Sequence, residues 1–230
     1  MPLIAEAREA AAARRRAASN GTAFWFTSYL GPNRYNRAAA PAGEGALTPV
    51  GFLVEQDPET TVAAHFHQAD QFQVMVAGGG TLGRHPVVPG TVHFTGAFSA
   101  YGPIRAGAAG LAYFTLRNGW DPGARYMPGA RTDLPRGRRH REAAGAEIAP
   151  EPDGLVAARL ALAPGAPMAG PDPAEGAGMF WVVLDGALEL TGARLGPRSC
   201  AFVAPGEAVP QARAAAAGAT VLALRFPRAG

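Results

Sequence analysis

Short apolar stretches separated by turn residues make up most of this chain. From Pro49 to residue 116, clusters of glycine, proline and aspartate separate these stretches. Short runs with turn residues between them are typical of β-strands rather than helices. The pattern predicts strands at Val50–Glu55, Thr60–His67, Gln71–Val76, Val87–Phe94, Ile104–Arg105 and Ala112–Leu116.

The same pattern returns after residue 150. Phe180–Gly186 repeats the pattern of Phe72–Gly78, so two copies of one β-module explain the chain best. Strands that follow one another without intervening helices favour an antiparallel barrel or sandwich. The strands predicted in the second copy are Leu155–Leu162, Phe180–Leu184, Ala187–Thr191, Cys200–Val203 and Thr220–Phe226.

Two segments outside the strand pattern complete the predicted organisation. Residues 3–18 are rich in alanine, glutamate and arginine, which favour a helix, and Ser19-Asn20-Gly21 supplies a stop signal. Residues 117–150 form a polar stretch rich in proline, glycine and arginine. We therefore expect a helix and strand extension at 1–48, a barrel at 49–118, a linker at 119–150 and a second barrel at 151–230.

The amino-acid composition limits which cellular compartment and which binding partners are expected for this chain. The chain has 230 residues, 48% of them hydrophobic, and a net charge of +3. No apolar run approaches the roughly 20 residues of a membrane span, and none follows the N-terminal arginines as in a secretory signal. All basic residues are arginine, which is typical of a GC-rich bacterial genome, and the single Cys200 favours a reducing cytoplasm. The basic run at 136–141 lacks interleaved aromatics and indicates a solvated linker, so neither nucleic acid nor membrane is expected as a partner.

The pair His65 and His67 carries the strongest chemical signal. Side chains at i and i+2 on a strand point to the same side, so both imidazoles should face one region. Two neutral nitrogen ligands aimed into one cavity form half of a transition-metal site. Such a pair also occurs on solvated strand faces, but the apolar strands around this one favour a pocket.

The spacing around this pair resembles the first motif of the cupin superfamily. In that motif a glycine is followed after five residues by His-x-His, then by a glutamate and, six residues later, by a second glycine. Here Glu59 occupies the first position, His65 and His67 the histidine positions, Gln71 the carboxylate position and Gly78 the last. Gln71 offers a neutral amide oxygen, a weaker donor than a carboxylate.

The second cupin motif is matched in spacing more than in residue type. Gly90 holds its glycine position, Gly96 and Phe98 replace proline and glycine, and Tyr101 falls on the histidine position. His93 lies eight residues before Tyr101, the interval that separates a metal-binding tyrosine from the motif histidine in ectoine synthases, which are also cupins.

The resemblance implies an all-β bicupin, with two tandem cupin (double-stranded β-helix or jelly-roll) barrels and a short N-terminal helix. It also implies one divalent transition metal, Fe, Mn, Ni or Zn, and either His93 or Tyr101 is open as the third ligand. Tyr101 is in addition the candidate catalytic acid or base. The predicted metal ligands are His65, His67, Gln71 and His93.

Strand alternation extends the predicted pocket. If His65 and Gln71 face inward, Gln73 and Met75 should as well, and both are candidate substrate-binding residues. Met75 is equally well explained as core filling. We expect His85, which precedes Pro86 in a turn, to be solvated, and assign no role to His140 in the basic linker.

The second barrel lacks comparable chemistry. No histidine follows His140, and the positions of the metal ligands hold Pro173, Glu175 and Met179. We therefore expect a metal-dependent enzyme whose N-terminal barrel acts on a small polar molecule, as a lyase, isomerase, cyclase or dioxygenase. The alternative is a non-catalytic bicupin that binds or senses a small molecule with a decayed metal site. A homodimer is compatible with either function.

Overall fold

The computed structural model describes residues 1–31 and 47–228. Within these ranges the chain consists mainly of strands and divides into two compact units. We call residues 13–145 the N-terminal barrel, and residues 1–12 together with 146–230 the C-terminal barrel. Residues 32–46, within the expected extension at 1–48, lie outside the described residues.

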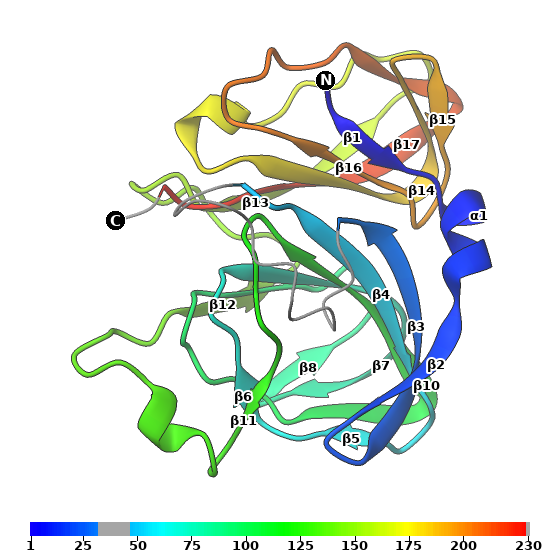
Figure 1. The fold of residues 1–230 in the computed structure, drawn as a ribbon. Coiled ribbons are helices and arrows are strands. Elements are labelled where there is room, and N and C mark those ends of the chain that lie inside the picture. The colour runs from blue at the N-terminus through cyan, green and yellow to red at the C-terminus, as the bar shows by residue number, and fades with distance from the viewer. Residues whose placement is uncertain (32–46, 229–230) are drawn as a thin grey trace. The chain divides into compact units, whose positions relative to one another are not determined.

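An antiparallel sheet forms most of the N-terminal barrel (Figure 1). Its order is β12-β9-β7-β10-β4-β3-β2, with β5 paired to β10 and β8 to β7. A separate pair, β6 with β11, contributes to the same unit. The strands are β2 (Arg15–Ser19), β3 (Thr22–Leu30), β4 (Val50–Gln56), β5 (Thr61–Val62), β6 (His65–Phe66), β7 (Gln71–Leu82), β8 (His85–Val87), β9 (Val92–Thr95), β10 (Ile104–Arg117), β11 (Arg125–Tyr126) and β12 (Glu142–Gly145), with a 3₁₀ turn η2 (Arg131–Asp133).

The C-terminal barrel is built on a second antiparallel sheet, of order β1-β16-β14-β17-β13, with β15 paired to β14. The N-terminal strand β1 therefore belongs to this sheet, where Leu3 lies opposite Phe202 and Ala5 opposite Cys200. Its elements are β1 (Leu3–Ala5), α1 (Ala7–Ala10), η1 (Ala11–Ala13), β13 (Val156–Leu162), η3 (Pro173–Glu175), β14 (Met179–Leu190), β15 (Ala193–Leu195), β16 (Cys200–Val203) and β17 (Ala212–Arg225).

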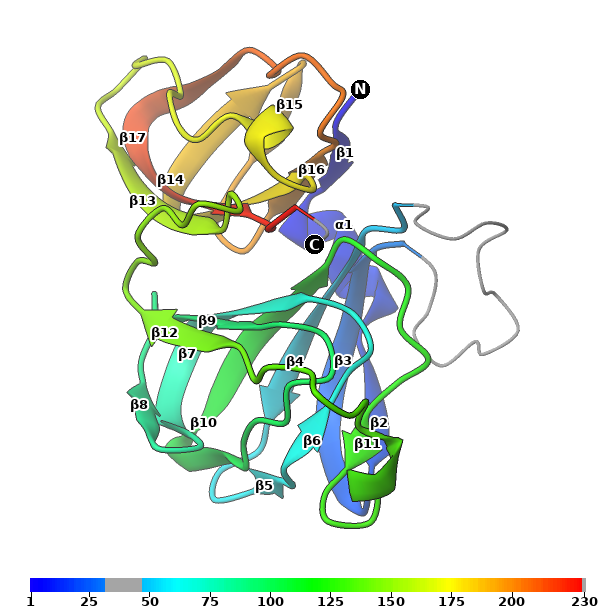
Figure 2. The ribbon, with the colours of Figure 1, turned by 90° about the vertical axis from the view of Figure 1, so that its left-hand side faces the viewer.

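Strand lengths repeat between the two barrels. Strands β4, β7, β8, β9 and β10 have 7, 12, 3, 4 and 14 residues, and β13, β14, β15, β16 and β17 have the same lengths in the same order. Figure 2 shows that each of the two sheets is curved. Two copies of one module, as the sequence predicts, account for this repeat.

A glycine bend sits at the same place in both long hairpins. Gly78 has φ of +69° and Gly186 has φ of +68°, in the left-handed region that favours glycine. A Cβ at Gly78 would lie 2.1 Å from the Gly110 carbonyl oxygen, and one at Gly186 would lie 2.2 Å from that of Gly218. Only glycine therefore lets the two long strands of each barrel approach at this point.

The N-terminal segment differs from its prediction. The helix expected over residues 3–18 is confined to α1, and β2 follows it. Helix propensities differ by at most about 0.7 kcal/mol per ordinary residue, which strand pairing overrides. Arg16 illustrates this: it lies over the ring of Trp25, its partner in the β2–β3 pairing, and it pairs with Asp57, just after β4, at 2.8 Å.

The segment expected to be a linker also contributes strands. Within residues 119–150, β11 pairs with β6 and β12 pairs with β9. Its polar composition concealed these strands because each is only two to four residues long. Among the described residues, no helix is both long and apolar enough to cross a bilayer.

Candidate functional site

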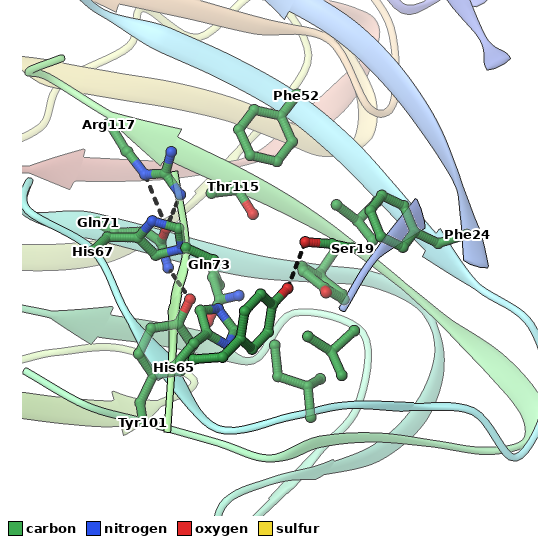
Figure 3. A pocket seen from close by; sticks show the side chains of 16 residues that line it. Ser19, Phe24, Phe52, His65, His67, Gln71, Gln73, Tyr101, Thr115 and Arg117 are labelled. Carbon is green, nitrogen blue, oxygen red and sulfur yellow. Dashed lines mark hydrogen bonds between the residues drawn. The ribbon is translucent and has the colours of Figure 1, made fainter. Parts of the chain in front are cut away.

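A small cavity of about 30 Å³ lies inside the N-terminal barrel. Most of its lining is buried, whereas Ser19, Ala124 and Tyr126 are partly exposed and form its mouth. The Tyr126 hydroxyl donates to Ser19 Oγ at 2.5 Å across this mouth (Figure 3). The lining residues are Ser19, Phe24, Phe52, Val54, Val62, His65, His67, Gln71, Gln73, Tyr101, Ile104, Tyr113, Thr115, Arg117, Ala124 and Tyr126.

His65 and His67 both line this cavity, with ring centroids 5.1 Å apart and nearly perpendicular planes. His65 Nδ1 lies 2.7 Å from the Ala63 carbonyl oxygen, and His67 Nδ1 lies 2.8 Å from Asp121 Oδ2. A carbonyl or a carboxylate can only accept, so Nδ1 carries the proton in both rings. In the neutral rings, Nε2 is therefore the nitrogen that keeps its lone pair.

Asp121 is the electrostatic centre of the site. Its oxygens accept from His67 Nδ1, from the backbone N–H of Gln68 and of Gly123, and pair with Arg117 Nη1 at 3.1 Å. Burial alone would raise the pKa of Asp121, but the charge of Arg117 and the contact with His67 lower it below its usual range. Asp121 is therefore ionised, and it neutralises the buried guanidinium.

Arg117, Gln71 and Tyr101 form a hydrogen-bonded row along one wall (Figure 3). Gln71 Oε1 accepts from Arg117 Nε at 3.0 Å and from Nη2 at 2.6 Å, and Gln71 Nε2 donates to the Tyr101 hydroxyl at 2.7 Å. The pKa of Tyr101 is raised by burial, against smaller lowering effects of Gln71 and Arg117. The phenol thus accepts from Gln71 and keeps its own proton.

The remaining predicted residues divide between the cavity and the core. Gln73 lines the cavity, whereas Met75 is fully buried in the apolar cluster of the barrel. His93 is fully buried and is not one of the lining residues. Its Nδ1 lies 3.1 Å from Gln73 Oε1 and its Nε2 lies 2.9 Å from Glu142 Oε1.

These contacts test the metal site that the resemblance implies. Both lone pairs of Gln71 Oε1 face Arg117, both nitrogens of His93 are engaged, and Tyr101 is a neutral phenol. The Gln71 oxygen and both His93 nitrogens thus contact protein groups, and the expected role of these residues as ligands stays a prediction. Among the described residues, no group of three histidine, cysteine, aspartate or glutamate side chains could hold a metal ion. The imidazoles of His65 and His67 remain as candidate ligands, one fewer than the three protein ligands of catalytic zinc sites.

Sequence reasoning missed Arg117 and Asp121. Arg117 ends β10 and has the same strand parity as Thr115, which also lines the cavity, so alternation along that strand could have indicated it. Asp121 lies within the stretch interpreted as a linker. A buried arginine requires a partner, and the aspartate four residues later was the available signal.

Comparisons with known proteins show which folds this chain resembles. No protein-family model and no curated protein matches the chain. Among solved structures, a bacterial pirin from Escherichia coli in complex with nickel(II) is 14% identical, with all of both chains covered and a TM-score of 0.55. Oxalate decarboxylase of Bacillus subtilis, with Mn(II) centres, is 9% identical over 95% of this chain and 77% of its own, with a TM-score of 0.58. A provisionally assigned dioxygenase from Nostoc punctiforme is 12% identical over 97% and 78% of the two chains, with a TM-score of 0.56.

Proposed function

We propose that this chain, which has the bicupin fold predicted from its sequence, is an enzyme that moves a proton on a small polar molecule. The reaction belongs to the isomerase, lyase or cyclase class, with His67 as the base and Tyr101 as the acid. One observation carries the proposal, the buried 2.8 Å hydrogen bond between His67 Nδ1 and Asp121.

His67 is suited to accept a proton. Because Asp121 is ionised and accepts from Nδ1, it fixes the tautomer whose Nε2 has a lone pair, and it stabilises the imidazolium that forms. Arg117 balances the charge of Asp121 while His67 is neutral. Asp121 is thus a positioning residue for His67.

Tyr101 is the group placed to donate a proton: burial raises its pKa, and Gln71 and Arg117 offset part of that rise. The amide N–H of Gln71 already points at the phenolic oxygen, and Arg117 orients that amide. Both groups favour the phenolate that remains after proton donation, as their lowering effects on the pKa of Tyr101 indicate. Because these groups are held by one another before a substrate enters, no reorganisation is needed during the reaction.

The two groups together define a balanced reaction. His67 Nε2 removes a proton from the substrate, for instance beside a carbonyl group, and Tyr101 delivers one to another substrate atom. The electron pair of the broken bond stays within the substrate, so neither oxidant nor reductant is consumed. The cavity of about 30 Å³ suits a small reacting group.

Metal binding by His65 and His67 is the second candidate function. It is favoured by the Nδ1 contacts of both rings, which put the lone pair of each neutral ring on Nε2, and by the position of both rings at one cavity. The outer hydrogen bond from His67 to a carboxylate is also common among metal-binding histidines. To supply a third ligand, Gln71 would have to give up its bonds to Arg117.

Exchange of substrate protons with solvent tests the proposal. The chain is incubated in deuterium oxide with a panel of small ketones, aldehydes and hydroxy acids, and proton NMR follows the loss of signals beside the carbonyl. We expect exchange that His67→Asn and Tyr101→Phe each slow by about 10²-fold or more, while chelator treatment leaves it unchanged. The exposed His140→Asn variant is the matched control.

Two outcomes of this experiment would redirect the assignment. Exchange that a chelator abolishes and Mn(II), Fe(II), Ni(II) or Zn(II) restores would establish the metal-dependent function instead. Ligands that shift His67 resonances without any exchange would identify a non-catalytic binding protein.

A further inference from the structure

The cavity of the N-terminal barrel has one polar wall and one apolar wall. The hydrogen-bonded side chains of Gln71, Tyr101 and Arg117 belong to the polar wall. Figure 3 shows Gln71 and Tyr101 on one side of the cavity and the Phe24 ring on the other. The apolar wall consists of Phe24, Phe52, Val54, Val62 and Ile104. A ligand in this cavity therefore contacts hydrogen-bonding groups at one end and hydrocarbon at the other.

Neighbouring strands bring the residues of the apolar wall together. Phe52 and Val54 lie two residues apart on β4 and so point to the same side, and Phe24 comes from β3, which pairs with β4. Val62 on β5 lies opposite Ile104 on β10. All five are buried in the apolar core cluster of the barrel. Their side chains contain no polar atom, so they cannot hydrogen-bond to a ligand.

The positive charge on the polar wall is already balanced. Arg117 is the only arginine among the described residues that line the cavity, and the chain contains no lysine. Its Nη1 lies 3.1 Å from Asp121 Oδ2, and its Nε and Nη2 donate to Gln71 Oε1. An anion that enters this cavity therefore loses its hydration without gaining an uncompensated arginine.

The size of the cavity limits the ligand to a short molecule. Its volume of about 30 Å³ is roughly two to three times the 10–15 Å³ that one water needs. At the mouth, the Tyr126 hydroxyl donates to Ser19 Oγ at 2.5 Å, which links β11 to β2. A chain of a few non-hydrogen atoms matches this space, whereas a sugar ring does not.

We propose that the ligand of this cavity is a short, uncharged carbonyl compound with an apolar end, such as a small ketone or aldehyde. Its carbonyl oxygen accepts from the Tyr101 hydroxyl, and its alkyl group packs against Val54 and Val62. This inference rests on the proposed function, because it takes the cavity as the substrate site and narrows the class of substrate.

The two walls select against charge and against polar ends for different reasons. A hydroxyl group placed against the apolar wall loses its hydrogen bonds to water and finds no side-chain partner there. A carboxylate loses more, because its charge is desolvated as well. An alkyl group at the same position gains by leaving water. A simple ketone should therefore bind more tightly than a carboxylate or a polyol of the same size.

Titration of the full-length protein, followed through its methyl resonances in ¹³C NMR spectra, tests the inference. 2-Butanone and propanoate are nearly equal in size and differ in charge, whereas 3-pentanone and dihydroxyacetone differ in whether their ends are apolar. We expect 2-butanone and 3-pentanone each to bind at least about tenfold more tightly than its counterpart and to shift the methyl resonances of Val54, Val62 and Ile104. Equal affinity within either pair, or no binding of either simple ketone, would overturn the inference.

Two matched variants separate the apolar wall from general effects on the barrel. Val54→Thr replaces a methyl group of this wall with a hydroxyl and should weaken 3-pentanone binding by about fivefold without weakening dihydroxyacetone. Val50→Thr makes the same change on the same strand and in the same apolar cluster, but outside the lining, and should leave both affinities unchanged. Equal weakening of 3-pentanone in the two variants would contradict the role of this wall.

Binding and reaction give separate outcomes. 3-Pentanone that binds as expected but exchanges no protons with solvent would support this ligand class and contradict the proposed function. Exchange of protons in hydroxy acids but not in simple ketones would support the proposed function and overturn this ligand class.

Discussion

At the scale of single residues, the site depends on one buried carboxylate. Asp121 accepts from His67 and two backbone N–H groups and pairs with Arg117. Both side chains of the Arg117–Asp121 pair are 1% exposed. Removing one partner of a buried pair is costly, because the other charge stays buried without compensation.

Asp121→Asn should therefore destabilise the N-terminal barrel by about 3–5 kcal/mol, the usual cost of breaking a buried pair. Urea unfolding monitored by tryptophan fluorescence provides the measurement. The matched control is Asp133→Asn, which breaks the exposed Arg125–Asp133 pair and should cost at most about 1 kcal/mol. A comparable loss in both variants would mean that Asp121 contributes no more than a surface charge.

The sequence indicated which residues lie at the cavity better than it indicated what each of these residues does there. Strand alternation predicted His65, His67, Gln71, Gln73 and Met75 on one side; the first four line one cavity, whereas Met75 packs in the core. It could not show that Arg117 engages the oxygen of Gln71, because that contact joins residues 46 positions apart. Competition for one amide oxygen depends on tertiary structure.

At the scale of elements, the same lesson holds for the N-terminus. We predicted an all-β fold with a short N-terminal helix, and the short helix α1 is present. The strand β1 before it, however, completes the sheet of the C-terminal barrel. The sequence pattern identified most strands of the two barrels because turn residues flank them. It did not show that Leu3–Ala5, next to a good helix-forming segment, pairs with Cys200–Val203.

Deletion of residues 1–6 should consequently loosen the C-terminal barrel. Ala5 lies opposite Cys200, whose burial raises the pKa of its thiol to about 12 and keeps it unreactive. Without β1, the edge of β16 is exposed, and labelling of Cys200 by a thiol reagent should accelerate by about tenfold or more. Leu3→Ala keeps the backbone pairing and should label at nearly the parental rate. An unchanged rate in the deletion would show that β1 does not protect this edge.

At the scale of the whole chain, the two barrels share a framework and differ in chemistry. Arg117 ends β10 opposite Gln71, and Arg225 ends β17 opposite Met179. Arg225 instead contacts Glu175 and the carbonyl oxygens of Gly154 and Asp172.

The neighbouring polar positions are replaced as well. By position along the equal-length strands, Gln73 corresponds to Trp181 and His93 to Ala201, both in the apolar core of the C-terminal barrel. These replacements support our proposal that the N-terminal barrel carries the chemistry and the C-terminal barrel is structural.

Acid should affect the two barrels unequally. The pKa of Glu142 is lowered to about 2, mainly by its hydrogen bond to His93. Because the unfolded carboxyl titrates near 4.5, this stabilisation is complete above about pH 4.5 and is lost as the pH falls towards 2. The lowered pKa of His93 acts in the same direction, because below about pH 6.5 the unfolded chain binds the proton more readily.

We accordingly expect the N-terminal barrel to lose stability between about pH 6.5 and pH 3 while Cys200 stays protected. Urea unfolding at several pH values, with Cys200 labelled by a disulfide reagent that reacts in acid, separates the two barrels. Glu142→Gln should flatten the pH dependence of the N-terminal transition. Simultaneous exposure of Cys200 at every pH would show instead that the barrels unfold as one unit.

The central claim is that His67, held by Asp121, acts without a metal, and histidine NMR with Zn(II) tests it most directly. In ¹⁵N spectra of the ligand-free protein, His65 and His67 should both be neutral with the proton on Nδ1, and one equivalent of Zn(II) should leave their Nε2 resonances unchanged. Asp121→Asn should shift the tautomer of His67 but not that of His65. A joint shift of both Nε2 resonances, complete at one equivalent of Zn(II), would contradict the account and establish a metal site on the two histidines.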